Sequence, residues 1–420
     1  MKRFLSLFLA YSGLTACNPL GSSQSDSYFG ACGSVFWYIT GAGPWGDFKQ
    51  CIVNTIRLGG PSAPSFSTIS VANSTGQQWE SGVLAPNGKI YGIPGGASPA
   101  KNPAKVLVVT PASQTATTIE VTNTSQVIWN GGVLAGNGLI YGIPNDSANG
   151  GNTPQEVLVI DPTNDSISKI TFDNPSPGFR WTGGVLAPNG KIYAVSEGGT
   201  NPTTVLVIDP GGAAAGTITF TNATNASWSA AVLGPDGKIY GIPSGGRNPE
   251  TVLVIDPDTN LIDTTHTFVN ASNTTWQGGV LASNGKIYCV PNSGGNPAKV
   301  GVIDPTNIAG TTFVSIVNAS NVVWQGGVYV ADGKIYGIPT IQTNPVSMLM
   351  IDPATDTATI STSITNTALE TWHGVTMAGD GKAYGMPFSG SSSAKVLVIN
   401  PQSSGQFNVN VLLSGYYNKY

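Results

Sequence analysis

A sevenfold repeat contains one variable position whose side chains could do chemistry. Its clearest copy is Trp181-Thr-Gly-Gly-Val-Leu-Ala-Pro-Asn-Gly-Lys-Ile-Tyr193, and successive copies begin 47 to 52 residues apart. The residues that follow the seven tryptophans are Glu80, Asn130, Thr182, Ser229, Gln277, Gln325 and His373. In a closed ring the first and last copies are neighbours, so we expect Glu80 and His373 to lie together at the mouth of a central channel. Such a pair could act as an acid and a base or bind a metal ion.

The alternative interpretation of this position is structural, namely a polar rim hydrated by water in the channel. The chain has only two histidines, and His266 falls in an outer-strand context, which excludes a site with three histidine ligands. The sequence contains no Ser-His-Asp spacing, nucleophile elbow, calcium loop or phosphate-binding loop. We therefore expect no cofactor.

Each repeat carries four strand signals that would position these residues. In the third copy, residues 183–187 would form the first strand, residues 188–190 a turn and residues 191–195 the second strand. A third strand such as 251–255 and a more polar fourth strand such as 217–220 complete the unit. An Asn-Gly or Asp-Gly pair separates the first two strands in all seven copies, and this pair is the strongest short hairpin signal.

The third strand is apolar at successive positions, as in Val252-Leu-Val-Ile255, so it must be covered on both faces. Seven units packed side by side and closed into a ring meet this requirement without special caps. We therefore predict an all-β fold, a seven-bladed β-propeller of four-stranded antiparallel blades, over residues 65–413. A short N-terminal preface (28–64) would come before it and a tail (414–420) after it. The repeats start near residues 79, 129, 181, 228, 276, 324 and 372.

The fourth-strand pattern occurs eight times for seven blades. Residues 68–79 align without gaps on residues 217–228, which places one such strand before the first repeat. Residues 407–412 supply another after the last repeat. Blade seven should therefore carry either a clasp from the N-terminus or an extra edge strand.

The seven tryptophans and the tyrosines of the second strands recur in every repeat. Burial of one tryptophan removes roughly 150–250 Å² from water, and recurrence in all copies is typical of packing residues. The alternative is an aromatic ring that binds sugars. The Gly-Gly pair that follows most of the tryptophans indicates a close approach of strands near the axis.

The first 16 residues have a basic start and an apolar stretch from Phe4, the pattern of a secretory signal. Their junction with the next residue, Leu14-Thr-Ala-Cys17, resembles the lipobox of bacterial lipoproteins. The resemblance implies cleavage before Cys17 and acylation of this cysteine, as with palmitate, which would anchor the chain in a membrane. An ordinary signal peptide with a chance cysteine is the alternative. Residues 17–27 are polar and would form the lipidated tether.

The net charge limits the ligands that the chain could bind, and the remaining cysteines indicate where a disulfide could form. Removal of the signal would take Lys2 and Arg3, leaving 16 basic and 22 acidic residues and a formal charge of −6. A mildly acidic chain without basic runs argues against nucleic acid as a partner. Outside the cytoplasm Cys32 and Cys51 could form a disulfide, whereas Cys289 lies in a strand and is expected to be a buried free thiol.

Two motifs of the repeat are Val-x-Val-Ile-Asp before a threonine turn and a later Pro-Asn-Gly-Lys-Ile-Tyr. From Ser65 to about Leu413 this pattern resembles the YVTN-type repeats of bacterial surface-layer and secreted propellers. The resemblance implies a scaffold and no particular chemistry, because the Trp-x-Gly-Gly opening and the Tyr-Gly-Ile-Pro ending depart from the family pattern. The ending Ser414-Gly-Tyr-Tyr-Asn-Lys-Tyr420 resembles the tails of spirochaete-type lipoproteins.

These features predict a lipid-anchored propeller of the bacterial cell envelope. We expect it at the outer membrane, and the sequence leaves open whether it is exposed at the cell surface. It would act as a non-enzymatic, adhesin-like binding module for a protein or a glycan. The alternative is a propeller hydrolase or lyase that uses the channel mouth near Glu80 and His373. The candidate binding residues on the rim are Asn130, Arg247, Gln277 and Gln325.

Overall fold

The computed structural model describes residues 64–401 with gaps at 73, 96–103, 123–127, 146–154, 174–179, 198–202, 223–225, 246–249, 271–273, 294–298, 318–322, 331, 341–345, 365–369 and 390–393. The chain divides into two compact units, Met1–Asn54 and Thr55–Tyr420, and every described residue belongs to the second. The predicted signal, tether and cysteine pair, the preface up to residue 63 and the C-terminal tail lie outside the described residues. Within the described part, no helix has the length and apolarity needed to cross a membrane.

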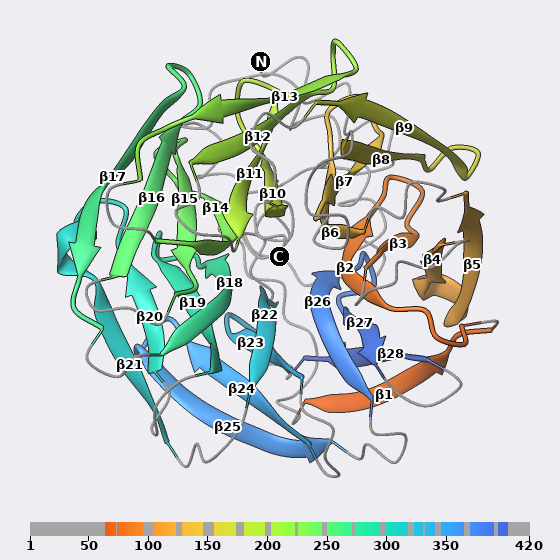
Figure 1. The fold of residues 1–420 in the computed structure, drawn as a ribbon. Helices are drawn as coiled ribbons and strands as arrows, with labels where there is room; N and C mark the ends of the chain where they lie inside the picture. Colours follow the sequence, from red (N-terminus) through yellow and green to blue (C-terminus); the bar gives the residue numbers. More distant parts are fainter. Residues whose placement is uncertain are drawn as a thin grey trace, which may run out of the picture. The chain divides into compact units, whose positions relative to one another are not determined.

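Repeats one to six form the four strands that their sequence predicts, and repeat seven forms the first three of its own (Figure 1). The first strand begins at or just before the tryptophan and lies nearest the centre. These inner strands are β2 (Trp79–Leu84), β6 (Trp129–Leu134), β10 (Arg180–Leu186), β14 (Trp228–Leu233), β18 (Thr275–Leu281), β22 (Trp324–Tyr329) and β26 (Thr371–Met377). The second strands are β3 (Ile90–Pro94), β7 (Ile140–Pro144), β11 (Ile192–Glu197), β15 (Ile239–Pro243), β19 (Ile287–Ser293), β23 (Ile335–Pro339) and β27 (Ala383–Ser389).

The third and fourth strands complete each unit toward the outside. The third strands are β4 (Ala104–Thr110), β8 (Gln155–Asp161), β12 (Thr204–Asp209), β16 (Glu250–Asp256), β20 (Lys299–Ile303), β24 (Val346–Asp352) and β28 (Lys395–Asn400). The outer strands are β5 (Thr115–Val121), β9 (Ser166–Phe172), β13 (Ala214–Thr219), β17 (Leu261–Phe268), β21 (Thr312–Val317), β25 (Thr357–Ile364) and β1 (Ser65–Ser70). Among the described residues, the helices are two short 3₁₀ turns, η1 (Pro111–Ser113) and η2 (Ile308–Gly310).

The strands are hydrogen-bonded into six sheets, five of four strands and one of eight. The eight-stranded sheet combines repeats five and six, because the outer strands β21 and β25 pair in parallel over two residue pairs, Ile316 with Ala358 and Val317 with Thr359. The prediction of repeated four-stranded antiparallel units is confirmed. The expectation that each unit would form a sheet of its own fails at this seam, where two outer edges come close enough to bond.

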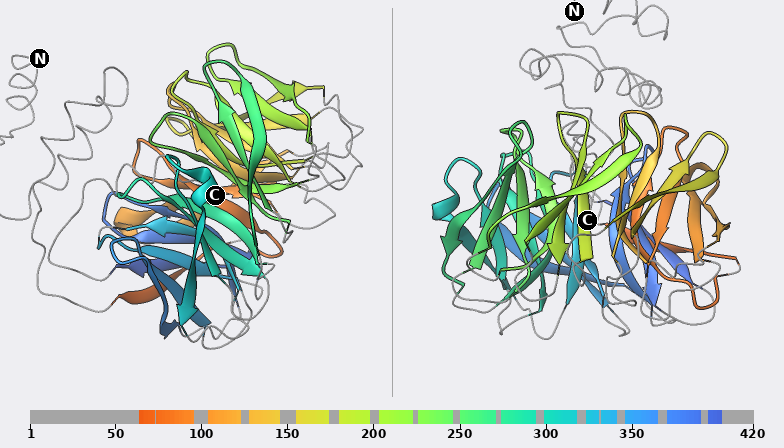
Figure 2. Two further views of the ribbon diagram at one scale, coloured as in Figure 1. Left: turned by 90° about the vertical axis from the view of Figure 1, so that its left-hand side faces the viewer. Right: turned by 45° about the horizontal axis from the view of Figure 1, so that its top comes forward.

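The inner strands contact one another in sequence and the last contacts the first, β26 with β2, so the array closes. Figures 1 and 2 show the sheets side by side around an axis. The outer strand of repeat seven comes from the start of the array. β1 pairs antiparallel with β28, from Ser65 opposite Asn400 to Ser70 opposite Lys395. The clasp from the N-terminus is therefore the arrangement found, while residues 407–412 lie outside the described residues.

The repeated tryptophans pack the units together, as predicted. All seven are at most 1% exposed to solvent. Six of them donate a hydrogen bond from Nε1 to a backbone carbonyl at the start of the third strand, as Trp228 does to Thr251 (2.9 Å) and Trp372 does to Lys395 (2.8 Å). The tryptophan therefore fixes the distance between the first and third strands of its own sheet.

The turns after the inner strands form a second set of contacts between repeats. The Gly of each Asn-Gly or Asp-Gly pair has a positive φ, for example +77° at Gly88 and +82° at Gly190. In several repeats the Asn side chain then reaches the Asp-Pro turn of the next repeat. Asn189 donates to the Pro257 carbonyl at 2.7 Å, and Asn284 donates to the Pro353 carbonyl at 2.9 Å. These bonds lie at the end of the strands opposite to the tryptophans.

Candidate functional site at the channel mouth

A β-bulge follows the tryptophan in every inner strand, and it positions the variable residue. In repeat one, Trp79 pairs with Pro94 and Ser81 pairs with Ile93, so Glu80 is an extra residue in the ladder. The register also shifts near the tryptophan in the other six inner strands, but in repeats three and seven the variable residue stays paired, Thr182 with Val195 and His373 with Met386, and the shift follows it. A bulge bends a strand and redirects its side chains, and bulges are frequent beside active sites.

Glu80 and His373 lie in contact where repeats one and seven meet. His373 Nδ1 is 2.9 Å from Glu80 Oε2, and the two residues are only 7% and 9% exposed. The backbones approach closely at this seam, because a Cβ added to Gly374 would lie 2.5 Å from the Glu80 carbonyl oxygen. The adjacency predicted from ring closure is confirmed.

Two further side chains hold the imidazole of His373. The ring stacks on Phe388, with centroids 3.5 Å apart and planes inclined by 9°. Its Nε2 lies 3.2 Å from Oγ1 of Thr340, which follows strand β23 of repeat six. Both ring nitrogens and one ring face are therefore occupied, so His373 has a defined orientation.

A second charged group of the mouth comes from repeat three. Arg180 and Glu197 are cross-strand partners at the ends of β10 and β11. Burial raises the pKa of the Glu197 carboxyl, and the negative charge of Glu80 raises it further, whereas Arg180 lowers it. The carboxyl groups of Glu80 and Glu197 are thus close enough to repel each other, with a cation beside them. Carboxyl groups with a shifted pKa and a specific charge partner are frequent at functional sites.

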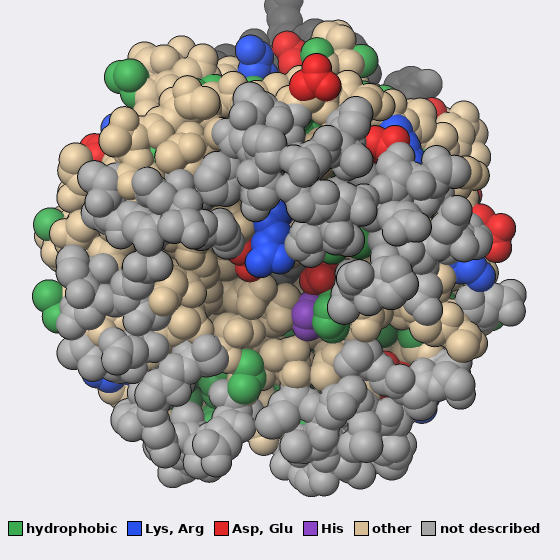
Figure 3. Space-filling model, in the orientation of Figure 1, with side chains coloured by type: hydrophobic (Ala, Val, Ile, Leu, Met, Phe, Trp, Pro, Cys, Tyr) green, Lys and Arg blue, Asp and Glu red, His purple; other side chains and the backbone are tan. Residues whose placement is uncertain are grey.

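We call the group formed by Glu80, His373, Thr340, Arg180 and Glu197 the mouth residues. Figure 3 shows a hollow near the centre of one face, with acidic, basic and histidine side chains at its edge. All five come from the tryptophan end of the strands, so they belong to one rim of the array. A concave site with a few converging charged groups is the usual form of a ligand site.

The other variable residues after the tryptophans mostly join repeats. Thr182 donates from Oγ1 to the Ser229 carbonyl at 3.2 Å, and Ser229 donates from Oγ to the Trp276 carbonyl at 2.8 Å. Asn130 and Gln325 are also buried, whereas Gln277 is partly exposed. A hydrated rim is therefore the wrong description for most of these positions, because the bulge turns the side chains into the seams between repeats. Arg247 lies outside the described residues.

Sequence reasoning missed three of the mouth residues. Thr340 directly follows the Pro of its second strand, Glu197 directly follows Ser196 at the matching position, and Arg180 directly precedes its tryptophan. The signal was present, since the position after this Pro or Ser also varies strongly between repeats. Its residues are Gly95, Asn145, Glu197, Ser244, Asn292, Thr340 and Phe388.

Cys289 and His266 are not among the mouth residues. Cys289 is a buried free thiol, as predicted, and burial raises its pKa, which disfavours the reactive thiolate. His266 lies on the outer strand β17 and pairs with Asp263 at 3.2 Å. Among the described residues, no group of three or more His, Cys, Asp or Glu side chains could hold a metal ion. In the mouth, Glu80 and His373 would supply two ligands.

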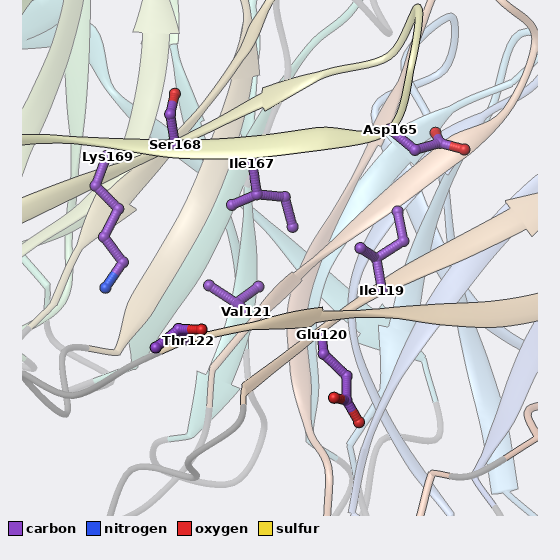
Figure 4. Close-up of a pocket in the computed structure, with 8 residues that line it drawn as sticks. All are labelled: Ile119, Glu120, Val121, Thr122, Asp165, Ile167, Ser168 and Lys169. Atoms are coloured by element: carbon purple, nitrogen blue, oxygen red, sulfur yellow. The ribbon is translucent and has the colours of Figure 1, made fainter.

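A second concavity, with a volume of about 530 Å³, lies between the outer strands β5 and β9 (Figure 4). Its charged side chains already have partners of opposite charge. Lys169 is 2.6 Å from Glu156, and Asp165 is 3.0 Å from Lys89. Paired charges offer less to a ligand, so this groove is a weaker candidate than the mouth.

The comparisons with known proteins support the fold and add no chemistry. No protein-family model matches the chain, and no curated protein matches its sequence. Among solved structures, the chain is similar to virginiamycin B lyase from Staphylococcus aureus, with 13% identity over 80% of this chain and 99% of that one and a TM-score of 0.58. It is also similar to YCF48 bound to D1 peptide, with 11% identity over 82% and 98% of the two chains and a TM-score of 0.51.

A third similar structure is the extracellular domain of the one-component system BT4673 from B. thetaiotaomicron. It shows 11% identity over 82% of this chain and 43% of that one, with a TM-score of 0.54. At such low identity the likeness concerns the fold alone. The chain is a β-propeller built of repeated four-stranded antiparallel units.

Proposed function

We propose that the chain is a seven-bladed propeller that serves as a lipid-anchored binding module of the bacterial cell envelope. The blade count follows if the eight-stranded sheet is two blades, since only two residue pairs join its halves. The ligand is a protein or a glycan that enters the mouth. The observation that carries this proposal is the set of charged mouth residues around a hollow at the end of the inner strands.

The anchor and location remain part of the proposal. The lipobox-like segment that ends at Cys17 supports acylation of this residue. Asn18 follows it, and Asn differs from the Asp that retains many bacterial lipoproteins at the inner membrane, which favours the outer membrane. The tether is short: a flexible chain of the nine residues 18–26 would keep the propeller on the order of 15–18 Å from the lipid. A propeller held so close to a membrane can present a rim to external ligands.

Two screens with the folded protein test the binding function. One applies it to a glycan array, and the other applies it to immobilised extracellular-matrix proteins. We expect saturable binding in one of the two screens. If both stay blank with protein that shows a cooperative thermal transition, the binding function is wrong.

A hydrolase or lyase that uses the same mouth is the second candidate function. The contact between Glu80 and His373 favours it, since a buried carboxylate and imidazole can transfer protons. The similar propellers include a lyase and a protein bound to a peptide, so the fold is compatible with both functions. Metal analysis of purified protein separates a metal-dependent version, which predicts bound metal that is lost in His373→Ala.

A further inference from the structure

Three side chains from three repeats form one hydrogen-bonded chain in the mouth. His373 Nδ1 lies 2.9 Å from Glu80 Oε2, and His373 Nε2 lies 3.2 Å from Thr340 Oγ1. A carboxylate, an imidazole and a hydroxyl in this order form the pattern that activates a hydroxyl nucleophile. We infer that Thr340 Oγ1 is the nucleophile of an acyl-transfer site that accepts carboxylic esters. The inference rests on the second candidate function and names its reacting atom and reaction class.

The surrounding structure holds the nucleophile and the base in place. The backbone N–H of Thr340 donates to the Val323 carbonyl at 3.1 Å, which fixes the main chain beneath the hydroxyl. Phe388 covers one face of the His373 ring. Thr340 itself is partly exposed, so a substrate in the mouth could reach its hydroxyl, whereas His373 and Glu80 are shielded from bulk water.

The donors and acceptors follow from the chemistry of the three groups. An ionised carboxylate only accepts hydrogen bonds, so the hydrogen of a neutral His373 ring sits on Nδ1 and is donated to Glu80. Nε2 is then an acceptor for the Thr340 hydroxyl. In this state Nε2 can take the hydroxyl proton, and the carboxylate of Glu80 stabilises the imidazolium that results.

The reaction balances with water as the only co-reactant. Thr340 Oγ1 attacks the ester carbonyl carbon, its proton moves to His373 Nε2, and the carbonyl electron pair moves onto oxygen. Collapse of this intermediate breaks the bond to the alcohol, which leaves with the proton from Nε2. Water then attacks the acyl-threonine by the same route, releases the carboxylic acid and restores the hydroxyl.

Repeat four has a hydroxyl at the position that corresponds to Thr340, and this hydroxyl contacts a serine in place of an imidazole. Ser244 also follows the proline that ends strand two, and its hydroxyl lies 3.0 Å from Oγ of Ser227. A serine hydroxyl is less hindered than that of threonine. If any hydroxyl at this position of a repeat reacted without a base, Ser244 would therefore react at least as fast as Thr340.

The test is covalent labelling of the full chain with a fluorophosphonate, read by intact mass and peptide mapping. Attack on phosphorus breaks the P–F bond, releases fluoride and leaves the phosphonyl group on the hydroxyl oxygen. We expect a single label on Thr340, its loss in Thr340→Val, and its retention in Thr340→Ser and Ser244→Ala. His373→Gln should lower the labelling rate by about 10²-fold or more. Glu80→Gln should also lower it, and Glu80→Asp should restore part of the loss.

No label on the wild-type chain, a label on Ser244 or another residue, or equal labelling of Thr340→Val would overturn the inference. Mapping on the wild-type chain decides the question even if a His373 variant fails to fold. Binding is measured separately, on the wild-type chain, in the two screens described above. A failure of labelling therefore leaves the binding function standing, and a failure of binding leaves the labelling result standing.

Discussion

The contact between Glu80 and His373 depends on two glycines that lie against Glu80. A Cβ placed on Gly95 would lie 2.1 Å from Cγ of Glu80, and a Cβ on Gly374 would meet the Glu80 backbone. Two side chains from opposite ends of the array can therefore meet in a nearly dry seam. The mouth therefore depends on the lack of a side chain at Gly95 and Gly374 as well as on Glu80 and His373 themselves.

We predict that Gly95→Ala displaces Glu80 and separates it from His373. The new methyl group overlaps Cγ of Glu80, so overpacking should lower the free energy of unfolding by about 1–3 kcal/mol. Gly136→Ala is the matched control, because a Cβ at Gly136 meets no atom within 4 Å. Chemical denaturation of both variants measures the effect, and equal stability of the two would show that Glu80 is not confined as described.

A second prediction concerns the pH dependence of stability at Glu370, which lies just before the inner strand β26. Burial raises its pKa to about 7, although Lys395 acts in the opposite direction. Because the folded state holds the proton more tightly than the unfolded state, this group stabilises the fold at low pH. Its contribution is lost as pH rises from about 4.5 to about 7 and amounts to about 1–2 kcal/mol after allowance for solvent screening.

The measurement is the unfolding free energy of wild type and Glu370→Gln between pH 4 and pH 8. The variant lacks the titrating group, so the difference between the two curves should change across that window and be flat above it. A constant difference would contradict the prediction.

The pairing of Glu80 with His373 could be predicted from the sequence, because both occupy the same repeat position and a closed ring joins its ends. Thr340, Arg180 and Glu197 could not, since each stands one residue outside the repeating motif. Their side chains reach the mouth only because the strands end there and the inner strands bulge. The variation between repeats marks the position of Thr340 and Glu197, but a single sequence does not show that these side chains enter the mouth.

At the scale of the element, repeat three differs from the other repeats at one residue near the end of its second strand, and this difference changes a hydrogen bond that recurs in the other six. The other six repeats have Pro near the end of the second strand, but β11 has Ser196 at this position. The Ser196 hydroxyl bonds to the Thr204 carbonyl, which corresponds to the carbonyl that the tryptophan indole takes elsewhere. Within the described structure, Nε1 of Trp181 is buried and has no hydrogen-bond partner.

We predict that Ser196→Pro stabilises the protein. It frees the Thr204 carbonyl for Trp181 and restricts the unfolded chain, and each effect contributes about 0.5–1 kcal/mol. The reverse change, Pro144→Ser in repeat two, should destabilise it, because Trp129 already bonds to the Glu156 carbonyl at 2.7 Å. Thermal unfolding measures both variants, and a lower midpoint for Ser196→Pro would refute the role given to Ser196.

The strands could be predicted from the sequence because their apolar runs and Asn-Gly turns recur in every copy. The parallel pairing of β21 with β25 could not, since it depends on how far two outer edges diverge. The bulges after the tryptophans could not be predicted from the sequence either. They follow from the fit between neighbouring repeats, as at Gly183, where an added Cβ would lie 2.6 Å from Cα of Ala230.

At the scale of the whole molecule, closure joins the two ends of the array in three places. β1 supplies the outer strand of repeat seven, and the Glu80–His373 contact joins the inner strands at the mouth. Gln114 of repeat one also donates to the Tyr384 hydroxyl of repeat seven at 2.8 Å. The sequence left the source of the closing strand open, because two segments carry the same pattern and only tertiary packing chooses between them.

The anchor gives a prediction for the intact cell. The wild-type protein should enter the detergent phase and incorporate labelled palmitate, whereas Cys17→Ser should be soluble or remain an uncleaved precursor. Protease treatment of intact cells then locates the propeller. Complete protection until the outer membrane is permeabilised would exclude contact with external ligands, and palmitate incorporation by Cys17→Ser would exclude this residue as the anchor.

The most direct test of a functional mouth compares the affinity of matched charge-neutral variants for the glycan or matrix protein that binds best in the screens. The Arg180→Gln, Glu197→Gln double variant should bind at least about tenfold more weakly, since loss of a hot-spot residue near the centre of an interface costs about 2 kcal/mol or more. Lys191→Gln, at the opposite end of repeat three, should bind like the wild type. Equal affinity of the double variant and the wild type, with weaker binding by Lys191→Gln, would place the binding surface on the other rim and contradict the account.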